Sequence, residues 1–270
     1  MSKKKIVVGA LQLPTLGMNA TRLEFYLKKA KEREAEIILF GEYVLNSFFG
    51  DLINMSKNMI NRQSKKHIST LKRFAKEYDM VFVAPIVLEK KDGFHKYIMK
   101  ITPKSVKYYE QQILLPYPHW NEKAFFSNPI KPIKEPMSFT HKGFNIVVMS
   151  GFELHFEPFW HYVSKKKADL VLIPTASTFG SYDRWREIIK TKSFLHSCYI
   201  LRANRVGEYV DDIIRWKFYG DTMLVSPSGE IDMFLEDKES MLIEEIYKSE
   251  IKNHRKAWGF NKELKLRGWF

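Results

Sequence analysis

The chain has 270 residues, of which 45% are hydrophobic and 28% charged, a balance that is typical of a globular protein and excludes a disordered chain. No apolar run approaches the roughly 18 residues that cross a bilayer, and MSKKK is followed by a strand-like segment, not by a secretory signal. We therefore expect a soluble, cytoplasmic protein that does not act in a membrane.

The excess of 44 Lys and Arg over 31 Asp and Glu gives a net charge of +13, which raises nucleic acid as a possible partner. The lysines are spread in short runs along the whole chain, and no nucleic-acid-binding motif accompanies them. The charge therefore favours a basic, solvated surface, and a nucleic-acid partner is not expected.

Metal and cofactor sites are not expected either. The single cysteine, Cys198, cannot form an internal disulfide or a cysteine zinc cage, and we expect it to be a buried, inert thiol. The histidines lack the spacing of three or four residues that puts two metal ligands on one helix face, since His155 and His161 are six apart. The sequence thus predicts no metal and no cofactor.

In chain order, the first half predicts a buried strand over residues 6–13 and then a helix that Asn19 can cap. Leu23, Leu27 and Ala30 recur on one face of that helix. The same alternation continues with a strand over 36–40, a helix over 64–78, a strand over 80–88 and strand-like stretches over 97–101 and 106–115.

The second half repeats this pattern. It predicts strands over 144–149, 170–173, 199–203 and 222–226, and helices over 155–164 and 182–197. No linker rich in Gly, Ser or Pro divides the chain, and no short-period repeat is present. We therefore expect one layered α/β domain over residues 1–270.

Three segments carry candidate chemistry. Glu42 directly follows a buried strand, where ligand sites of α/β sheets collect, so it is a candidate general base or an ordinary turn residue. Residues 108–126 combine aromatic side chains with Gln112 and Glu122, as a pocket wall or a plain core would. At Ser150 and Gly151 a strand breaks into a turn, which marks either a nucleophile elbow or a tight bend.

The order and spacing of the segments resemble the nitrilase superfamily of carbon–nitrogen hydrolases over nearly the whole chain. The matching segments are IVVGALQLP, EREAEIILFGE, NEKAFF, SGFELHFEP, ADLVLIPTAS, FLHSCYILRANRVG and YGDTMLVSPSGEI. The resemblance implies a four-layer αββα sandwich made of two similar halves, assembled as a homodimer or higher homo-oligomer through the elbow side.

The resemblance also implies a site in which a cysteine attacks an amide or nitrile carbon, a glutamate relays the proton and a lysine stabilises the oxyanion. It places Glu42 at the general-base position and Glu122 at the position of a second, supporting glutamate. Gln112 falls where the lysine belongs, and Gly151 falls where the nucleophile belongs. Phe152, Glu153 and Ser177 are expected to border the pocket.

Neither remaining candidate nucleophile replaces the missing cysteine simply. Cys198 matches a different segment of the family pattern. Ser150 is adjacent to Gly151, but consecutive side chains of an extended segment point to opposite faces, so the elbow would have to shift by one residue. The family's usual cysteine-dependent hydrolysis is therefore not expected.

Three functions remain open. The first is a binding or regulatory protein, in which Glu42 and Glu122, with Gln112 between them, hold a small amide, nitrile or amine, the amine replacing the lost lysine cation. The second is a hydrolase of non-peptide carbon–nitrogen bonds that uses water activated by Glu42 or a nearby serine. The third is a basic scaffold for nucleic acid or protein, which the charge alone supports.

Overall fold

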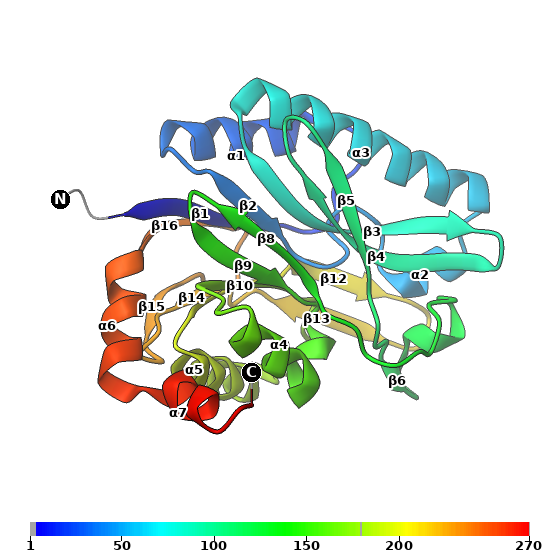
Figure 1. Ribbon diagram of the computed structural model, residues 1–270. Coiled ribbons are helices and arrows are strands. Elements are labelled where there is room, and N and C mark those ends of the chain that lie inside the picture. The colour runs from blue at the N-terminus through cyan, green and yellow to red at the C-terminus, as the bar shows by residue number, and fades with distance from the viewer. Residues whose placement is uncertain (1–3, 179, 270) are drawn as a thin grey trace.

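The computed structural model describes residues 4–178 and 180–269. Two six-stranded sheets pack face to face and are covered on their outer faces by helices (Figure 1). The first sheet contains, in spatial order, β16 (Ser240–Tyr247), β1 (Lys5–Gln12), β2 (Ile37–Phe40), β3 (Val81–Lys90), β4 (Gly93–Ile101) and β5 (Val106–Glu110). The second contains β15 (Ile231–Phe234), β14 (Met223–Val225), β11 (Tyr199–Ala203), β10 (Leu170–Pro174), β9 (Phe144–Val148) and β8 (Met137–His141).

The two sheets have the same internal plan. In each, three neighbouring strands run parallel, namely β1, β2 and β3 in one sheet and β9, β10 and β11 in the other. The flanking strands are antiparallel, one on one side and two on the other. The carboxyl ends of the parallel strands are where ligand sites of such sheets form.

Alternation along the strands sorts apolar side chains into the three cores that lie between the layers of the sandwich. Val8, Leu39 and Leu172 belong to the core between the two sheets, whereas Val7 and Ile38 belong to the core under α1 (Thr21–Glu32) and α3 (Lys57–Tyr78). The third core lies between the second sheet and helices α4 (Glu157–Lys165) and α5 (Tyr182–His196). The result is the four-layer αββα sandwich.

The expected strands and helices are present, with shifted ends. Helix α3 begins at Lys57, earlier than expected, because Ser56 caps it by accepting a hydrogen bond of 3.3 Å from the Met59 N–H. The periodicity did not indicate β8, β15, β16, α6 (Lys248–Trp258), α7 (Phe260–Leu266) or the hairpin of β12 (Val206–Val210) and β13 (Arg215–Tyr219). Several of these segments are only partly buried, so their apolar pattern is weak.

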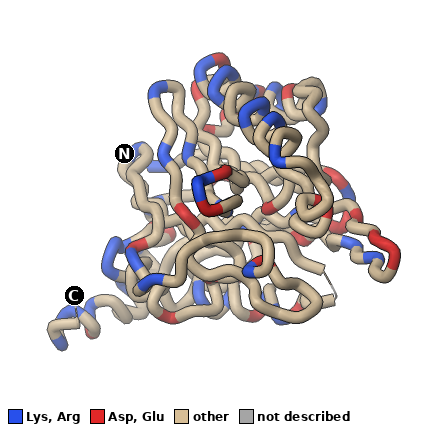
Figure 2. The backbone as a smooth tube through the Cα atoms, turned by 90° about the vertical axis from the view of Figure 1, so that its right-hand side faces the viewer, with Lys and Arg blue, Asp and Glu red and all other residues tan. Residues whose placement is uncertain are grey.

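Shorter elements connect the layers: α2 (Phe49–Ile53), β6 (Pro116–Tyr117), β7 (Trp120–Asn121) and the 3₁₀ turns η1 (Glu122–Ala124) and η2 (Phe152–His155). Figure 2 shows Lys and Arg on helices and loops around the periphery and not on one element alone. Within the described residues, no helix is long and apolar enough to cross a membrane.

Asp169 fastens the C-terminal helix α6 to the second sheet. Its side chain is fully buried at the start of β10. It accepts hydrogen bonds from Lys248 Nζ, from Arg255 Nη1 at 3.1 Å and from the Asn145 N–H at 2.8 Å. A buried carboxylate in such a network is costly to replace, because its partners lose the charge that they bind.

We therefore expect Asp169→Asn to lower the free energy of unfolding by about 2–4 kcal/mol in urea denaturation, since both cations lose their counter-ion. The matched control is Asp212→Asn at an exposed loop position, which should change stability by less than about 0.5 kcal/mol. Equal effects of the two changes would contradict this role of Asp169.

Candidate functional site

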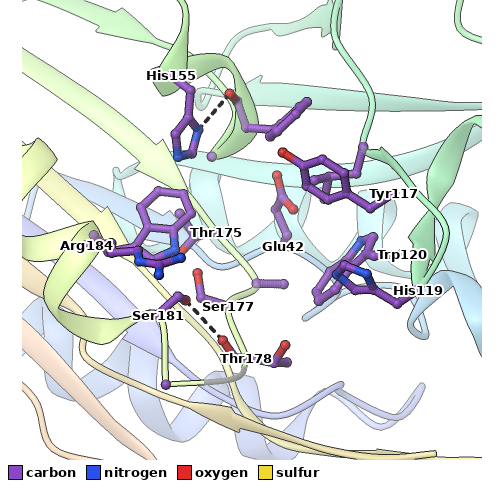
Figure 3. A pocket seen from close by; sticks show the side chains of 16 residues that line it. Glu42, Tyr117, His119, Trp120, His155, Thr175, Ser177, Thr178, Ser181 and Arg184 are labelled. Carbon is purple, nitrogen blue, oxygen red and sulfur yellow. Dashed lines mark hydrogen bonds between the residues drawn. The ribbon is translucent and has the colours of Figure 1, made fainter.

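The carboxyl ends of β2, β9 and β10 open onto a cavity of ≈ 460 Å³. Aromatic side chains form much of its wall, and a few polar groups converge on it, as in small-molecule sites (Figure 3). The lining residues are Glu42, Leu115, Tyr117, His119, Trp120, Gly151, Phe152, His155, Thr175, Ala176, Ser177, Thr178, Gly180, Ser181, Arg184 and Trp185.

Glu42 reaches the cavity from a firmly held turn after β2. Its N–H donates to the carbonyl of Thr175 at 3.0 Å, which ties the end of β2 to the end of β10. The next residue, Tyr43, has φ +57°, a left-handed conformation that is unusual for a bulky side chain. The Tyr43 carbonyl accepts from Thr15 Oγ1 at 2.9 Å and from Arg205 Nη1 at 3.1 Å, and these bonds hold the turn in place.

Lys96, which the sequence pattern did not indicate, lies between the two glutamates. From β4, its Nζ lies 2.7 Å from Glu122 Oε1 and 3.4 Å from Glu42 Oε2, and its side chain is only 5% exposed. Asn128 clamps the Lys96 backbone on both sides, accepting from its N–H at 2.8 Å and donating to its carbonyl at 2.9 Å. The feature of the sequence that could have indicated Lys96 is a lysine within a strand whose neighbouring residues are buried.

The sequence predicted that Gln112 lies between the two glutamates, and this prediction is wrong. Its Nε2 donates to Tyr109 Oη at 2.8 Å and to the Lys134 carbonyl at 3.0 Å, while its Oε1 accepts from the Lys134 N–H. Gln112 therefore anchors a surface segment and does not line the cavity. The expectation that the carboxylates lack a cation is also wrong, because Lys96 provides one.

Glu122 acts inside this cluster and not at the cavity surface. It is fully buried and accepts from Lys96 Nζ, from the Tyr43 hydroxyl and from the Leu115 N–H at 3.3 Å. Its oxygens are thus occupied by protein donors. Glu122 holds Lys96 in place, and Glu42 is the carboxylate that faces the cavity.

Burial has a large effect on the protonation of Glu42. Burial raises the pKa of Glu42 to about 7. Its effect exceeds the opposing effect of the Lys96 charge, and the nearby charge of Glu122 raises the pKa further. A hydrogen bond from the Gly151 amide lowers that pKa in part. Burial alone lowers the pKa of Lys96, but the two glutamates outweigh it and leave that pKa raised. Near neutral pH, Glu42 is therefore present in both protonation states while Lys96 stays charged.

Gly151 lies at the start of η2 on the cavity wall, where a side chain has little room. A Cβ built there would lie 2.8 Å from Thr175 Cγ2 and 3.1 Å from the Pro174 carbonyl oxygen. The backbone angles, φ −55° and ψ −44°, are open to any residue, so the restriction comes from packing and not from backbone conformation. Thr175 fills the space that a larger side chain at this position would need.

Of the expected pocket residues, Phe152 and Ser177 line the cavity and Glu153 does not. Glu153 is fully buried and accepts from the Gln112 N–H at 2.7 Å, from the Ser150 N–H at 2.9 Å and from the Tyr109 hydroxyl at 3.0 Å. These bonds join the turn after β9 to the segment after β5. The Glu153 carboxylate therefore holds the wall of the cavity together and is not available to a ligand.

The other candidate nucleophiles lie outside the cavity. Ser150 is buried, its hydroxyl has no hydrogen-bond partner within the described residues, and it is not among the lining residues. Cys198 is also buried, and burial raises the pKa of its thiol to about 12. A thiol of that kind is not ionised near neutral pH and does not act as a nucleophile.

A family model described as carbon–nitrogen hydrolase matches residues 7–256 of the chain. The chain belongs to the carbon–nitrogen hydrolase family. Across 95% of the chain and 91% of the relative, it is 22% identical to the N-carbamoylputrescine amidase of Arabidopsis thaliana. It is 24% identical to the deaminated glutathione amidase of a Synechocystis strain, over 46% of the chain and 43% of that protein.

Solved structures of the family share the fold. A carbon–nitrogen hydrolase from Helicobacter pylori G27 superposes with a TM-score of 0.83 at 17% identity, covering 96% of this chain and 94% of that one. A mutant amidase from Nesterenkonia sp. AN1, in complex with butyramide, superposes with a TM-score of 0.75 at 16% identity, covering 96% and 97%. The αββα sandwich is therefore the family's architecture.

The raised pKa of Glu42 predicts a pH-dependent effect on stability. Because the folded-state pKa of about 7 exceeds the ordinary value of 4.5, the stability tied to Glu42 is complete below pH 4.5 and is lost as the pH rises through 7. Glu42→Gln removes this titration, so it should raise the free energy of unfolding at pH 8 by up to about 3 kcal/mol and change little at pH 4.5. Urea denaturation at both pH values, with the exposed Glu187→Gln as control, checks this; a gain that is the same at both pH values would contradict it.

The packing at Gly151 predicts a coupled pair of substitutions. Gly151→Cys alone should destabilise the protein by about 1–3 kcal/mol, because the new Cβ meets Thr175 Cγ2 at 2.8 Å. Thr175→Ser removes that methyl group and keeps the hydroxyl, which accepts from Arg202 Nε at 3.1 Å. The double variant should recover most of the loss in a double-mutant cycle of thermal unfolding, and additive losses would refute the steric cause.

Proposed function

We propose that the chain is a small-molecule-binding member of the carbon–nitrogen hydrolase family that takes an amide in the cavity at Glu42 and lacks cysteine-dependent hydrolysis. One observation carries the proposal. The buried cluster of Glu42, Lys96 and Glu122 is complete, while Gly151, packed against Thr175, holds the position that the family resemblance gives to the nucleophile.

Without the nucleophile, the family's cysteine-dependent hydrolysis loses most of its rate. In a well-studied protease, removing the nucleophile costs on the order of 10⁶ in turnover. Cys198 does not replace it, because its thiol is buried away from the cavity and protonated. The hydrogen bonds of the Glu42 carboxylate within the described residues go to Lys96 Nζ and the Gly151 amide, so no hydroxyl is paired with this base.

An amide suits the polar end of the cavity. Ionised Glu42 accepts an N–H bond, and bonds to a charged acceptor are stronger than those between neutral groups. The relatives are named amidases, and a neighbouring structure holds butyramide, which supports an amide over the amine that a missing cation would have favoured. The aromatic walls give apolar contact to the rest of such a ligand.

Hydrolysis by water activated at Glu42 is the second candidate, and one observation favours it. A carboxyl group whose pKa is about 7 is well matched to proton transfer at neutral pH. This activity would not need a thiol, so it would survive Cys198→Ala and disappear in Glu42→Gln.

Calorimetric titration with butyramide tests the binding proposal. If only ionised Glu42 accepts the amide N–H, affinity should rise about tenfold from pH 6 to pH 8, following the ionised fraction of a group whose pKa is about 7. Glu42→Gln should remove this pH dependence, whereas Glu187→Gln at an exposed site should keep it. Absence of binding, or binding that does not change with pH in the natural protein, would refute the proposal.

Ammonia release from a panel of primary amides, nitriles and N-carbamoyl compounds separates the two functions. We expect no release from the natural protein and measurable release from Gly151→Cys/Thr175→Ser, which restores a thiol beside Glu42 while Lys96 already supplies the cation. Release from the natural protein that Glu42→Gln abolishes and Cys198→Ala leaves intact would establish the second function instead.

A further inference from the structure

A second hollow, of ≈ 700 Å³, lies where the C-terminal turns of α3 meet the turn between β4 and β5 (Figure 1). Ile101, at the end of β4, pairs with Phe82 near the start of β3, so this turn lies at the amino ends of the parallel strands. Glu42 follows the carboxyl end of β2, so the hollow is separate from the candidate site. We call the hollow the basic groove, and its lining residues are Lys72, Arg73, Lys76, Thr102, Pro103, Lys104, Ser105, Val106 and Tyr108.

Four cations line the basic groove, and none of its described lining residues is acidic. Lys72, Arg73 and Lys76 come from the last two turns of α3, and Lys104 comes from the turn that faces them. Among the described residues, the three lysines form no ion pair, whereas Arg73 Nη1 lies 3.2 Å from Glu77, which is outside the groove. Because these positive charges repel one another, an anion with several charges would both relieve that repulsion and be attracted to the groove.

The wall opposite α3 is a turn that its own hydrogen bonds hold in place. The Thr102 N–H donates to the Ser105 carbonyl at 2.8 Å. Thr102 Oγ1 accepts from the Ser105 N–H at 3.0 Å and from the Lys104 N–H at 3.3 Å. The backbone that carries Lys104 is therefore ordered before a ligand arrives, which lowers the entropy cost of binding.

Tyr108 gives the basic groove an aromatic surface and marks its end. The residue is 44% exposed, and the Tyr97 ring packs against it edge to face, with the ring centroids 6.2 Å apart. Tyr108 also lines a neighbouring cleft of ≈ 250 Å³, where Glu110 and Glu135 accompany two lysines. The positive charge without acidic neighbours thus ends at Tyr108.

We propose that the basic groove binds a nucleoside polyphosphate, whose phosphates lie among the cations of α3 and Lys104 and whose nucleobase stacks on Tyr108. Lysines bind phosphate as point charges, and a guanidinium such as that of Arg73 can bind two phosphate oxygens at once. An exposed aromatic ring stacks on the flat face of any nucleobase.

The limits of the positive charge favour a single nucleotide over a nucleic-acid strand. A strand that continued past Tyr108 would carry further phosphates into the cleft that contains Glu110 and Glu135. The inference does not depend on the proposed function, because the groove and the cavity at Glu42 lie at opposite ends of the parallel strands.

Calorimetry with ATP, AMP and inorganic tripolyphosphate, in buffer that contains EDTA, tests the inference. ATP should bind at least about fivefold more tightly than tripolyphosphate, because of stacking on Tyr108, and at least about tenfold more tightly than AMP, because of the added phosphates. Lys76→Gln/Lys104→Gln should weaken ATP binding at least about tenfold. Lys65→Gln, at an exposed position of α3 outside the groove, should leave it unchanged. Tyr108→Leu should remove the preference for ATP over tripolyphosphate.

Several outcomes would overturn the inference. Absence of ATP binding, or ATP binding that Lys76→Gln/Lys104→Gln leaves unchanged, would show that the groove is not a nucleotide site. Tripolyphosphate that binds as tightly as ATP, or a preference for ATP that persists in Tyr108→Leu, would remove the nucleobase from recognition. Tighter binding of decauridylate than of ATP, weakened by the same double variant, would assign the groove to single-stranded nucleic acid instead.

The same double variant separates this inference from the proposed function. Butyramide affinity should be the same in Lys76→Gln/Lys104→Gln and in the natural protein, because the two sites do not share a lining residue. Failure of butyramide to bind would therefore contradict the proposed function alone, and failure of ATP to bind would contradict this inference alone.

Discussion

The site depends on three charged groups that are held out of water where the two sheets meet. An isolated charge in a protein interior is costly, and removing one partner of a buried ion pair typically costs about 3–5 kcal/mol. Lys96 Nζ satisfies Glu122 at 2.7 Å and lies 3.4 Å from Glu42, so Lys96 and Glu122 have to be kept as a pair, with Glu42 beside them. The Asn128 clamp, the Tyr43 hydroxyl and the left-handed turn after Glu42 all serve to hold the three side chains in one arrangement.

The lysine lies where the two carboxylates need a cation, although it comes from a different segment of the chain than the family pattern indicates. The family pattern leads one to look for a cation at Gln112, after β5. Here the cation comes from the neighbouring strand β4, and the Gln111 N–H donates to the Lys96 carbonyl at 3.0 Å, so the two segments are adjacent. Because β4 supplies the cation, the Gln112 side chain is left to bind the Lys134 backbone.

This arrangement also explains what the sequence could and could not predict. The parallel strands were predictable, because continuous apolar runs bounded by polar residues carry the signal, and Glu42 was predictable as the polar residue after one of them. Lys96 was not, because its role depends on which face of β4 turns inward and on the antiparallel register with β5. The same holds for Glu153, two of whose partners lie about 40 residues away, and for Gly151, where the decisive fact is the distance to a methyl group of Thr175.

The protonation of Glu42 distinguishes a structural role from a functional one. Lys96 and Glu122 form a complete ion pair, which Tyr43 and Leu115 support, so packing does not require a second carboxylate. Glu42 raises the cost of folding at neutral pH, because burial holds its pKa near 7 and the folded state gives up its proton less readily than an unfolded chain does. A neutral glutamine of the same shape would avoid that cost. An ionisable group held at such a cost, at the edge of a cavity, is better explained by a ligand whose N–H it accepts than by the stability of the fold.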